Sequence, residues 1–131
     1  MISTEAIQDI GNSPLAQNFA NIWVEQYPDI DLVTETKFVS DRRFRADFAW
    51  GCSWLWGKNG KRRLLLPPGV LIDCHGGVHR VSAKFAKDNE KEAIALRLGF
   101  KYHRVYPETL EEKIGAIAQD IQQIITSRSH G

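Results

Sequence analysis

The stretches RRFRADFAW (42–50) and VLIDCHGG (70–77) predict two short β-strands, and each carries one carboxylate among apolar side chains. Asp47 lies among aromatic residues, and Asp73 follows three aliphatic ones. An ionised carboxylate in an apolar strand needs a partner, because removing it from water is costly. If the two strands lie side by side, both carboxylates meet at one edge of the sheet, where they can hold a hard, oxygen-preferring cation.

The rest of the chain supplies further strands and helices around these two. Ser13 and Pro14 begin a helix with an apolar stripe that Tyr27-Pro28 ends. The turn Asn59-Gly60, of predicted type I′, joins the arms of a hairpin over residues 52–66. Pro67-Pro68-Gly69 is expected to end the second arm before a strand over 70–74. The other predicted elements are strands over 32–38 and 100–106, a helix over 84–98 and a C-terminal helix from 107. The predicted order, α, β, β, hairpin, β, α, β, α, indicates an α/β fold with a mixed sheet flanked by helices.

Composition indicates one domain over residues 1–131, large enough to bury a core without disulfides. Cys52 and Cys74 form no zinc-ligand pattern, which favours a reduced, intracellular chain, although one disulfide between them is an alternative. The sequence shows no signal peptide and no transmembrane run, so we expect a cytoplasmic protein without a membrane partner.

The net charge of +1 hides a strong asymmetry along the chain. Acidic residues dominate before Lys37, whereas basic residues dominate from there to Arg63 and recur between Arg80 and Arg104. Clustered basic residues are typical of a surface that binds nucleic-acid phosphates. A solvated surface without a partner is the alternative reading of the same pattern.

Four motifs in order resemble the PD-(D/E)XK nuclease superfamily. They are FRADFAW (44–50), IDCHGG (72–77), DNEK (88–91) and GFKYHR (99–104), and the resemblance covers about residues 13–104. The sequence is similar in particular to small phage and bacterial nucleases of the very-short-patch-repair and resolvase types. The resemblance implies a restriction-endonuclease-like fold with this mixed sheet.

By this resemblance Asp47 and Asp73 are the metal-binding acids, and the backbone carbonyl of Cys74 is an additional ligand. Two carboxylates that hold Mg²⁺, or Mn²⁺ in its place, allow the metal to polarise the scissile phosphate and to activate water. The alternative is that the two aspartates end their strands or pair with arginines. The side chain of Cys74 is expected to face the other side of the sheet and to lie in the core.

Three residues depart from the family pattern. His75 stands where the superfamily has its catalytic lysine; it could orient or deprotonate water, or it could mark lost activity. Lys91 on the following helix is an alternative catalytic cation, or it forms a surface pair with Asp88. Gln17 stands where related nucleases often carry a glutamate, and it could bind water as an auxiliary group without supplying charge.

The hairpin over 52–66 is an insertion relative to small members of the family, and basic residues crowd its tip. Trp54 and Trp56 alternate to one face, where they either contact nucleic acid or belong to the core or a dimer contact. We expect DNA contacts from Arg42, Arg43, Arg45, Lys58, Lys61, Arg62, Arg63, His79, Arg80 and Lys84.

These observations predict a Mg²⁺-dependent DNA endonuclease that cuts phosphodiester bonds as a homodimer. The resemblance suggests branched DNA such as a four-way junction as the substrate, followed by a specific site in duplex DNA. A catalytically inactive DNA-binding module that keeps the fold is the principal alternative. A role in RNA or protein binding is a third reading.

Overall fold

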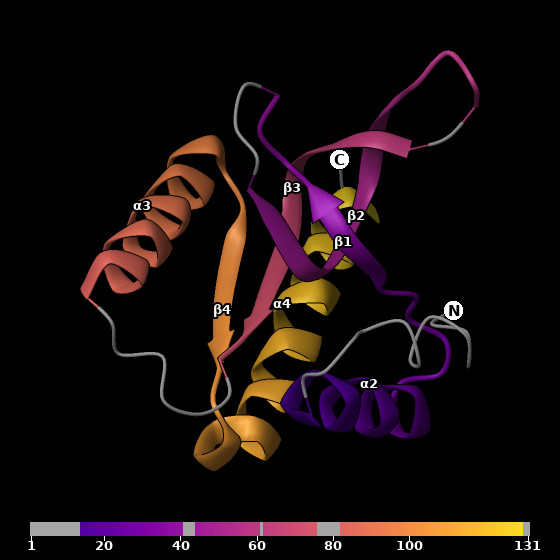
Figure 1. Cartoon of the computed structure of the whole chain (residues 1–131). Coiled ribbons are helices and arrows are strands. Elements are labelled where there is room, and N and C mark those ends of the chain that lie inside the picture. The colour runs from indigo at the N-terminus through magenta and orange to yellow at the C-terminus, as the bar shows by residue number, and fades with distance from the viewer. Residues whose placement is uncertain (1–13, 41–43, 61, 76–81, 130–131) are drawn as a thin grey trace.

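The computed structural model describes residues 14–40, 44–60, 62–75 and 82–129, which form a mixed β-sheet flanked by helices (Figure 1). The elements follow in the order α2 (Pro14–Gln26), β1 (Val33–Lys37), β2 (Arg45–Trp56), β3 (Arg62–Cys74), α3 (Ser82–Leu98), β4 (Lys101–Val105), the 3₁₀ turn η1 (Pro107–Thr109) and α4 (Leu110–Ser129). The predicted α/β class with a mixed sheet and flanking helices is therefore confirmed.

The four strands lie in the order β1-β2-β3-β4, so β2 and β3 occupy the centre of the sheet. The pairs β1–β2 and β2–β3 are antiparallel, whereas β3 and β4 are parallel. Helix α3 provides the crossover between the two parallel strands, as such a connection requires. The two strands predicted to carry the carboxylates are thus direct neighbours.

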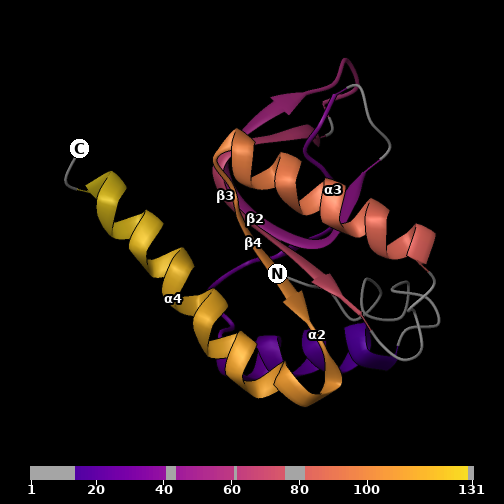
Figure 2. The ribbon, with the colours of Figure 1, turned by 90° about the vertical axis from the view of Figure 1, so that its left-hand side faces the viewer.

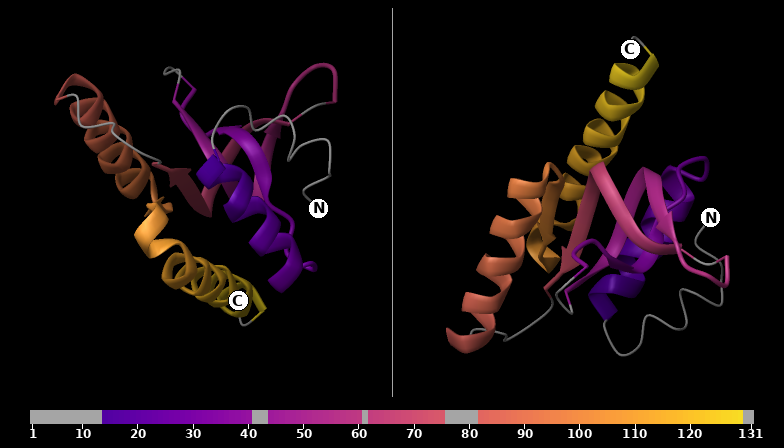
Figure 3. Two further views of the ribbon diagram at one scale, coloured as in Figure 1. Left: turned by 60° about the horizontal axis from the view of Figure 1, so that its bottom comes forward. Right: turned by 90° about the horizontal axis from the view of Figure 1, so that it is seen from above.

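Side chains on the two faces of the sheet form two separate buried clusters. On one face, α2 and α4 pack against apolar residues of β2, β3 and β4, with Phe19, Trp23, Ile117 and Ile121 fully buried among them. On the other face, Ala95 of α3 packs with Leu71, Phe100 and Tyr102. Helix α3 accordingly stands apart from α2 and α4 (Figures 1 and 3). In the described residues, no helix combines the length and apolar character that crossing a membrane requires.

Helix α4 follows the apolar period that its sequence predicts. Ile114, Ile117 and Ile121 recur at helical spacing and are almost fully buried, whereas Ile125 near the end is exposed. The burial stops because the C-terminal part of α4 projects beyond the sheet (Figure 2). Packing against the sheet, rather than helix propensity alone, therefore stabilises this helix as far as Ile124.

The predicted separate hairpin proves to be the far end of β2 and β3. The sequence predicted that Pro67-Pro68-Gly69 ends a strand, but β3 continues through these residues. The pairing register with β2 shifts there by one residue, since Gly51 pairs with Gly69 and Ser53 with Leu66. Proline lacks an N–H and cannot donate in the ladder, so the two prolines fit a bulge within β3.

The turn of the hairpin lies where the sequence predicted, but its type differs. The Gly60 N–H donates to the Gly57 carbonyl over 3.0 Å, and Gly60 has a φ of 77°. In the described residues Glu35 is the sole non-glycine with positive φ, so Asn59 does not have the positive φ that type I′ requires. Glycine after a turn adopts the left-handed conformation without steric cost, which explains the choice of Gly60.

Gly69→Ala is expected to lower the free energy of unfolding by about 1–3 kcal/mol, because an overpacked core forces the backbone to move. A Cβ at Gly69 would lie 2.9 Å from the Trp50 carbonyl oxygen and 3.3 Å from the Phe100 ring. Urea unfolding measures the effect. The matched control is Gly115→Ala on α4, where a Cβ meets nothing within 4 Å, and which should be neutral or stabilising. Equal losses in both variants would contradict the close packing at Gly69.

Candidate functional site

Asp47 and Asp73 lie opposite each other at the point where the β2–β3 ladder ends. Phe48 pairs with Ile72 in the last rung of the ladder, and the carboxylates continue the hydrogen bonding from there. The Asp47 N–H donates to Asp73 Oδ1 over 3.0 Å, and the Cys74 N–H donates to Asp47 Oδ2 over 2.9 Å. The expected juxtaposition of the two carboxylates is therefore present, and each is held by the backbone of the other strand.

Two further groups bind the second oxygen of Asp73. Lys91 Nζ of α3 lies 2.7 Å from Asp73 Oδ2 and also donates to the Arg45 carbonyl. The Tyr102 hydroxyl of β4 donates to the same oxygen. Asp73 is 4% exposed, so this carboxylate is a buried charge that is paired and hydrogen-bonded, as burial requires.

The pKa of Asp47 is raised to about 6. Burial is the larger cause of this rise, and the nearby charge of Asp73 is the next. The Cys74 N–H and the Lys91 ammonium act in the opposite direction, since both favour the ionised form. Two carboxylates therefore face one ammonium group, and the pair carries an excess of negative charge. A strongly perturbed carboxylate with such neighbours is a feature that functional sites share with some structural ion-pair networks.

Glu35 adds a third carboxylate near Asp47, and the sequence did not single it out. Thr34 pairs with Phe48 and Thr36 with Ala46, which places Glu35 at the register position opposite Asp47. Its charge also raises the pKa of Asp47. The φ of Glu35 is 50°, in the left-handed region that non-glycine residues rarely adopt. No motif marks this residue in the sequence, because only the β1–β2 register brings it here.

His75 lies beside α3 rather than on the carboxylate pair. Its Nδ1 is 3.6 Å from Asp88 Oδ2, and its ring stacks on Tyr106 at a centroid distance of 5.6 Å. Burial lowers the pKa of His75, so the neutral imidazole is favoured. Among the described residues Nε2 has no hydrogen-bond partner. Of the two alternative cations, Lys91 is thus the one whose side chain contacts Asp73.

Helix α3 is anchored to β4 by Arg104, and this contact positions Lys91. The guanidinium Nη2 donates to Asn89 Oδ1 over 2.9 Å and lies 3.0 Å from Glu92 Oε2. Asn89 and Glu92 flank Lys91 on the helix, so the contacts fix the helix where Lys91 can reach Asp73. The pairing of Lys91 with Asp88, the alternative that the sequence allowed, is replaced by pairing of Asp88 with His75.

The thiol of Cys74 faces away from the carboxylates, as strand alternation predicted. It is half-buried and packs against the cluster formed by α2 and α4. Burial raises the pKa of this thiol well above its ordinary value, so it is not a nucleophile at neutral pH. Cys52 and Cys74 are both free, so the alternative of a disulfide between them is wrong.

Mg²⁺ fits the donor chemistry of this pair. In the described residues no three His, Cys, Asp or Glu side chains converge on one point, so Asp47 and Asp73 would be its side-chain ligands. Mg²⁺ commonly binds proteins through one or two carboxylates and keeps several waters. Burial and then the charge of Asp73 raise the pKa of Asp47, and a divalent cation held by both carboxylates would stabilise their ionised forms. The Cys74 backbone is adjacent, since its N–H contacts Asp47.

The structure places only some of the other predicted site residues near the two carboxylates. Gln17 on α2 is half-buried. Arg45 is exposed beside Asp47, and Lys58 and Arg63 are exposed at the far end of the hairpin. Trp56 is exposed, whereas Trp54 packs partly on the core. Predicted DNA contacts that lie outside the described residues or side chains are Arg42, Arg43, Lys61, Arg62, His79, Arg80 and Lys84.

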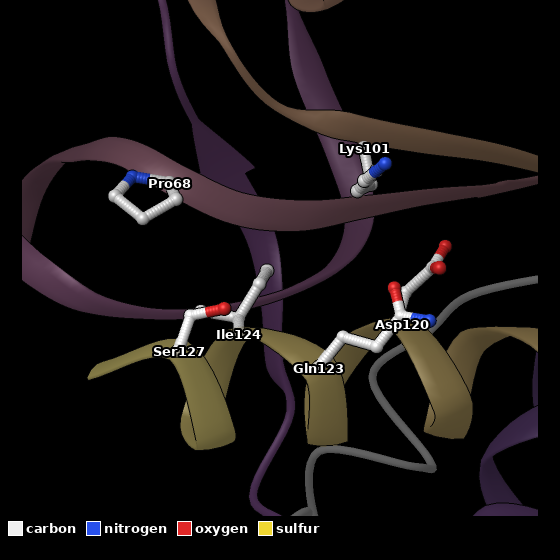
Figure 4. A pocket seen from close by; sticks show the side chains of 6 residues that line it. All are labelled: Pro68, Lys101, Asp120, Gln123, Ile124 and Ser127. Atoms are coloured by element: carbon white, nitrogen blue, oxygen red, sulfur yellow. The ribbon is translucent and has the colours of Figure 1, made fainter. Parts of the chain in front are cut away.

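A pocket of about 320 Å³ lies away from the carboxylate pair, between α4 and the β3–β4 part of the sheet (Figure 4). Its lining residues are Pro68, Lys101, Asp120, Gln123, Ile124 and Ser127. Asp120 is also 2.6 Å from Nε2 of the half-buried His103. None of the predicted site residues lines this pocket, and the chemistry argued from the sequence belongs to the opposite face.

No protein-family model, curated protein or solved structure matches this chain. The fold and the site define a small α/β protein in which two carboxylates and one lysine meet at the end of a central strand pair. The likeness to PD-(D/E)XK nucleases accordingly rests on the four sequence motifs.

Proposed function

We propose that this protein is a metal-dependent DNA endonuclease with a restriction-endonuclease-like domain that hydrolyses phosphodiester bonds. The observation that carries the proposal is the pairing of Asp47 and Asp73 on adjacent strands with Lys91 Nζ 2.7 Å from Asp73. Two carboxylates and a lysine are the residue types that metal-assisted phosphodiester hydrolysis needs at one place. The sequence motifs supply the same three residues in the order of the nuclease superfamily.

Each residue has a definable role in the proposed reaction. Asp47 and Asp73 would hold Mg²⁺ or Mn²⁺, and the Cys74 carbonyl would be an additional ligand. A bound divalent cation supplies a Lewis acid for the scissile phosphate and lowers the pKa of an attacking water. The Lys91 ammonium neutralises charge that develops on the phosphate. Tyr102 orients Asp73 through its hydroxyl.

DNA is the proposed partner because exposed basic residues flank the site. Arg45 lies two residues from Asp47 along β2, and Lys58 and Arg63 are exposed where the hairpin ends. Trp56 lies nine positions after Asp47, up to about 30 Å along an extended strand, so Lys58 and Arg63 at this end of the hairpin would contact phosphates far from the cut. Branched DNA or a specific duplex site is the proposed substrate, and a homodimer would cut both strands.

A catalytically inactive DNA-binding module is the second candidate. Both oxygens of Asp73 accept hydrogen bonds from protein groups, which is the arrangement of a structural ion pair. His75 also replaces the family's catalytic lysine and contacts Asp88 instead. These two observations favour a protein that keeps the fold and the basic surface without catalysis.

Asp47→Asn is expected to reduce DNA cleavage by roughly 100-fold or more, because it removes a ligand charge while conserving shape. Supercoiled plasmid, four-way junction and linear duplex are incubated with wild type or variant in Mg²⁺, Mn²⁺ or EDTA. Asp29→Asn, at an exposed carboxylate before β1, is the control and should cleave normally. DNA binding in EDTA without cleavage under any condition would establish the inactive module instead.

A further inference from the structure

Protein donors already bind both oxygens of the Asp73 carboxylate. Asp73 Oδ2 binds the Lys91 ammonium at 2.7 Å and accepts from the Tyr102 hydroxyl, while Oδ1 accepts from the Asp47 N–H at 3.0 Å. With Asp73 only 4% exposed, solvent offers no further approach to the carboxylate. Oδ2 therefore has both of its lone pairs engaged, and a cation can bind this oxygen only if one of its donors withdraws.

The three donors differ in their freedom to move. The Asp47 N–H belongs to the backbone of a central strand, and Tyr102 is packed with Leu71, Ala95 and Phe100. Lys91 is attached to α3 through a flexible four-carbon side chain, and the side chain is 14% exposed. Lys91 can therefore withdraw by changing rotamers, whereas the other two donors would require movement of the sheet or its core.

We propose that Lys91 and a divalent cation compete for the same place at Asp73 Oδ2, so that Lys91 regulates metal binding at this site. This inference rests on the proposed function. Without metal, the Lys91 ammonium compensates the charge of the buried Asp73 carboxylate. It also donates a hydrogen bond to the Arg45 carbonyl, which holds the side chain over the site. When a divalent cation enters, repulsion between the two positive charges expels Lys91 and frees its ammonium for the phosphate of the substrate.

Lys91→Met tests the competition, because methionine keeps the apolar stem and removes the charge. Isothermal titration with Mg²⁺ and Mn²⁺, in the absence of DNA, should show at least about tenfold tighter binding to the variant. Lys91→Arg retains a cation and should bind metal as weakly as wild type. Lys87→Met removes a charge from an exposed position one turn earlier on α3 and should leave metal affinity unchanged.

A measurement on the wild type makes the test independent of variant folding. Amine acetylation followed by mass spectrometry should label Lys91 severalfold faster in saturating Mg²⁺ than in EDTA, because the expelled ammonium becomes exposed. Lys87 serves as the internal control, and its labelling rate should not change.

The outcomes separate this inference from the proposed function. Metal-dependent cleavage by the wild type, together with equal Mg²⁺ affinity in Lys91→Met and unchanged Lys91 labelling, would overturn the competition and keep the nuclease. Tight metal binding by Lys91→Met alone, with no cleavage by the wild type, would support the competition and overturn the nuclease. Absence of metal binding in both proteins would overturn the competition.

Discussion

Asp73→Ala is expected to lower the free energy of unfolding by about 3–5 kcal/mol, whatever the function of the site, because removing one member of a buried, hydrogen-bonded ion pair is strongly destabilising. The Lys91 ammonium would lose its carboxylate, and the Tyr102 hydroxyl and the Asp47 N–H would lose their acceptor. Such a loss is a large share of the stability of a small domain, which is typically about 5–15 kcal/mol.

Urea unfolding in EDTA measures this loss, with Asp29→Ala as a control that should change stability by less than about 0.5 kcal/mol. The double variant Asp73→Ala/Lys91→Met sharpens the test. It should be more stable than Asp73→Ala alone, since the unpaired ammonium is then absent. Equal stability of the single and double variants would show that Lys91 is not paired with Asp73 in solution. Loss of cleavage in Asp73→Ala is therefore a poor test of catalysis, and Asp47→Asn is preferable.

The stability of the metal-free protein is expected to fall between about pH 4 and pH 6 because of Asp47. Burial, followed by the charge of Asp73, raises the pKa of Asp47 from 3.8 to about 6 in the folded protein. In this pH range the unfolded chain releases the proton while the folded protein retains it. The contribution of Asp47 is thus fully present below pH 3.8 and is lost as the pH rises through 6, by on the order of 2–3 kcal/mol.

Asp47→Asn lacks this titration and provides the comparison. Its stability relative to wild type should increase from pH 4 to pH 6.5 and then level off, in urea unfolding with EDTA present. Asp29→Asn, at an exposed position, should give a constant difference over the same range. A constant difference for Asp47→Asn as well would contradict the raised pKa and the burial that causes it.

Local sequence patterns predicted the elements that depend on local chemistry. The spacing of apolar residues indicated α2 and α4, and alternation around Asp47 and Asp73 indicated the two central strands. The Asn-Gly pair marked the hairpin turn. The same approach failed at Pro67-Pro68-Gly69, which looked like a strand end. The strand continues because pairing with β2 on the far side of the bulge outweighs the missing hydrogen-bond donors.

The site was predictable only in part. Asp47 and Asp73 attracted notice because ionised groups in apolar strands are costly, and Lys91 because it belongs to a family motif. Glu35 was missed because a glutamate in a strand has no distinctive local signal, and Tyr102 was given no role although it lies within the motif GFKYHR. Each acquires a role only through register: β4 lies parallel to β3 beside Asp73, and β1 places Glu35 opposite Asp47.

The α/β class and the two carboxylates could be predicted from local patterns, because periodicity and the cost of burying charge act within a short stretch. Which groups these carboxylates contact depends on the tertiary fold. Lys91, Tyr102 and the Cys74 N–H reach them from three elements, over separations of up to 29 residues along the chain. Strand register and the docking of α3 determine such contacts, and both depend on packing across the whole sheet rather than on any one segment.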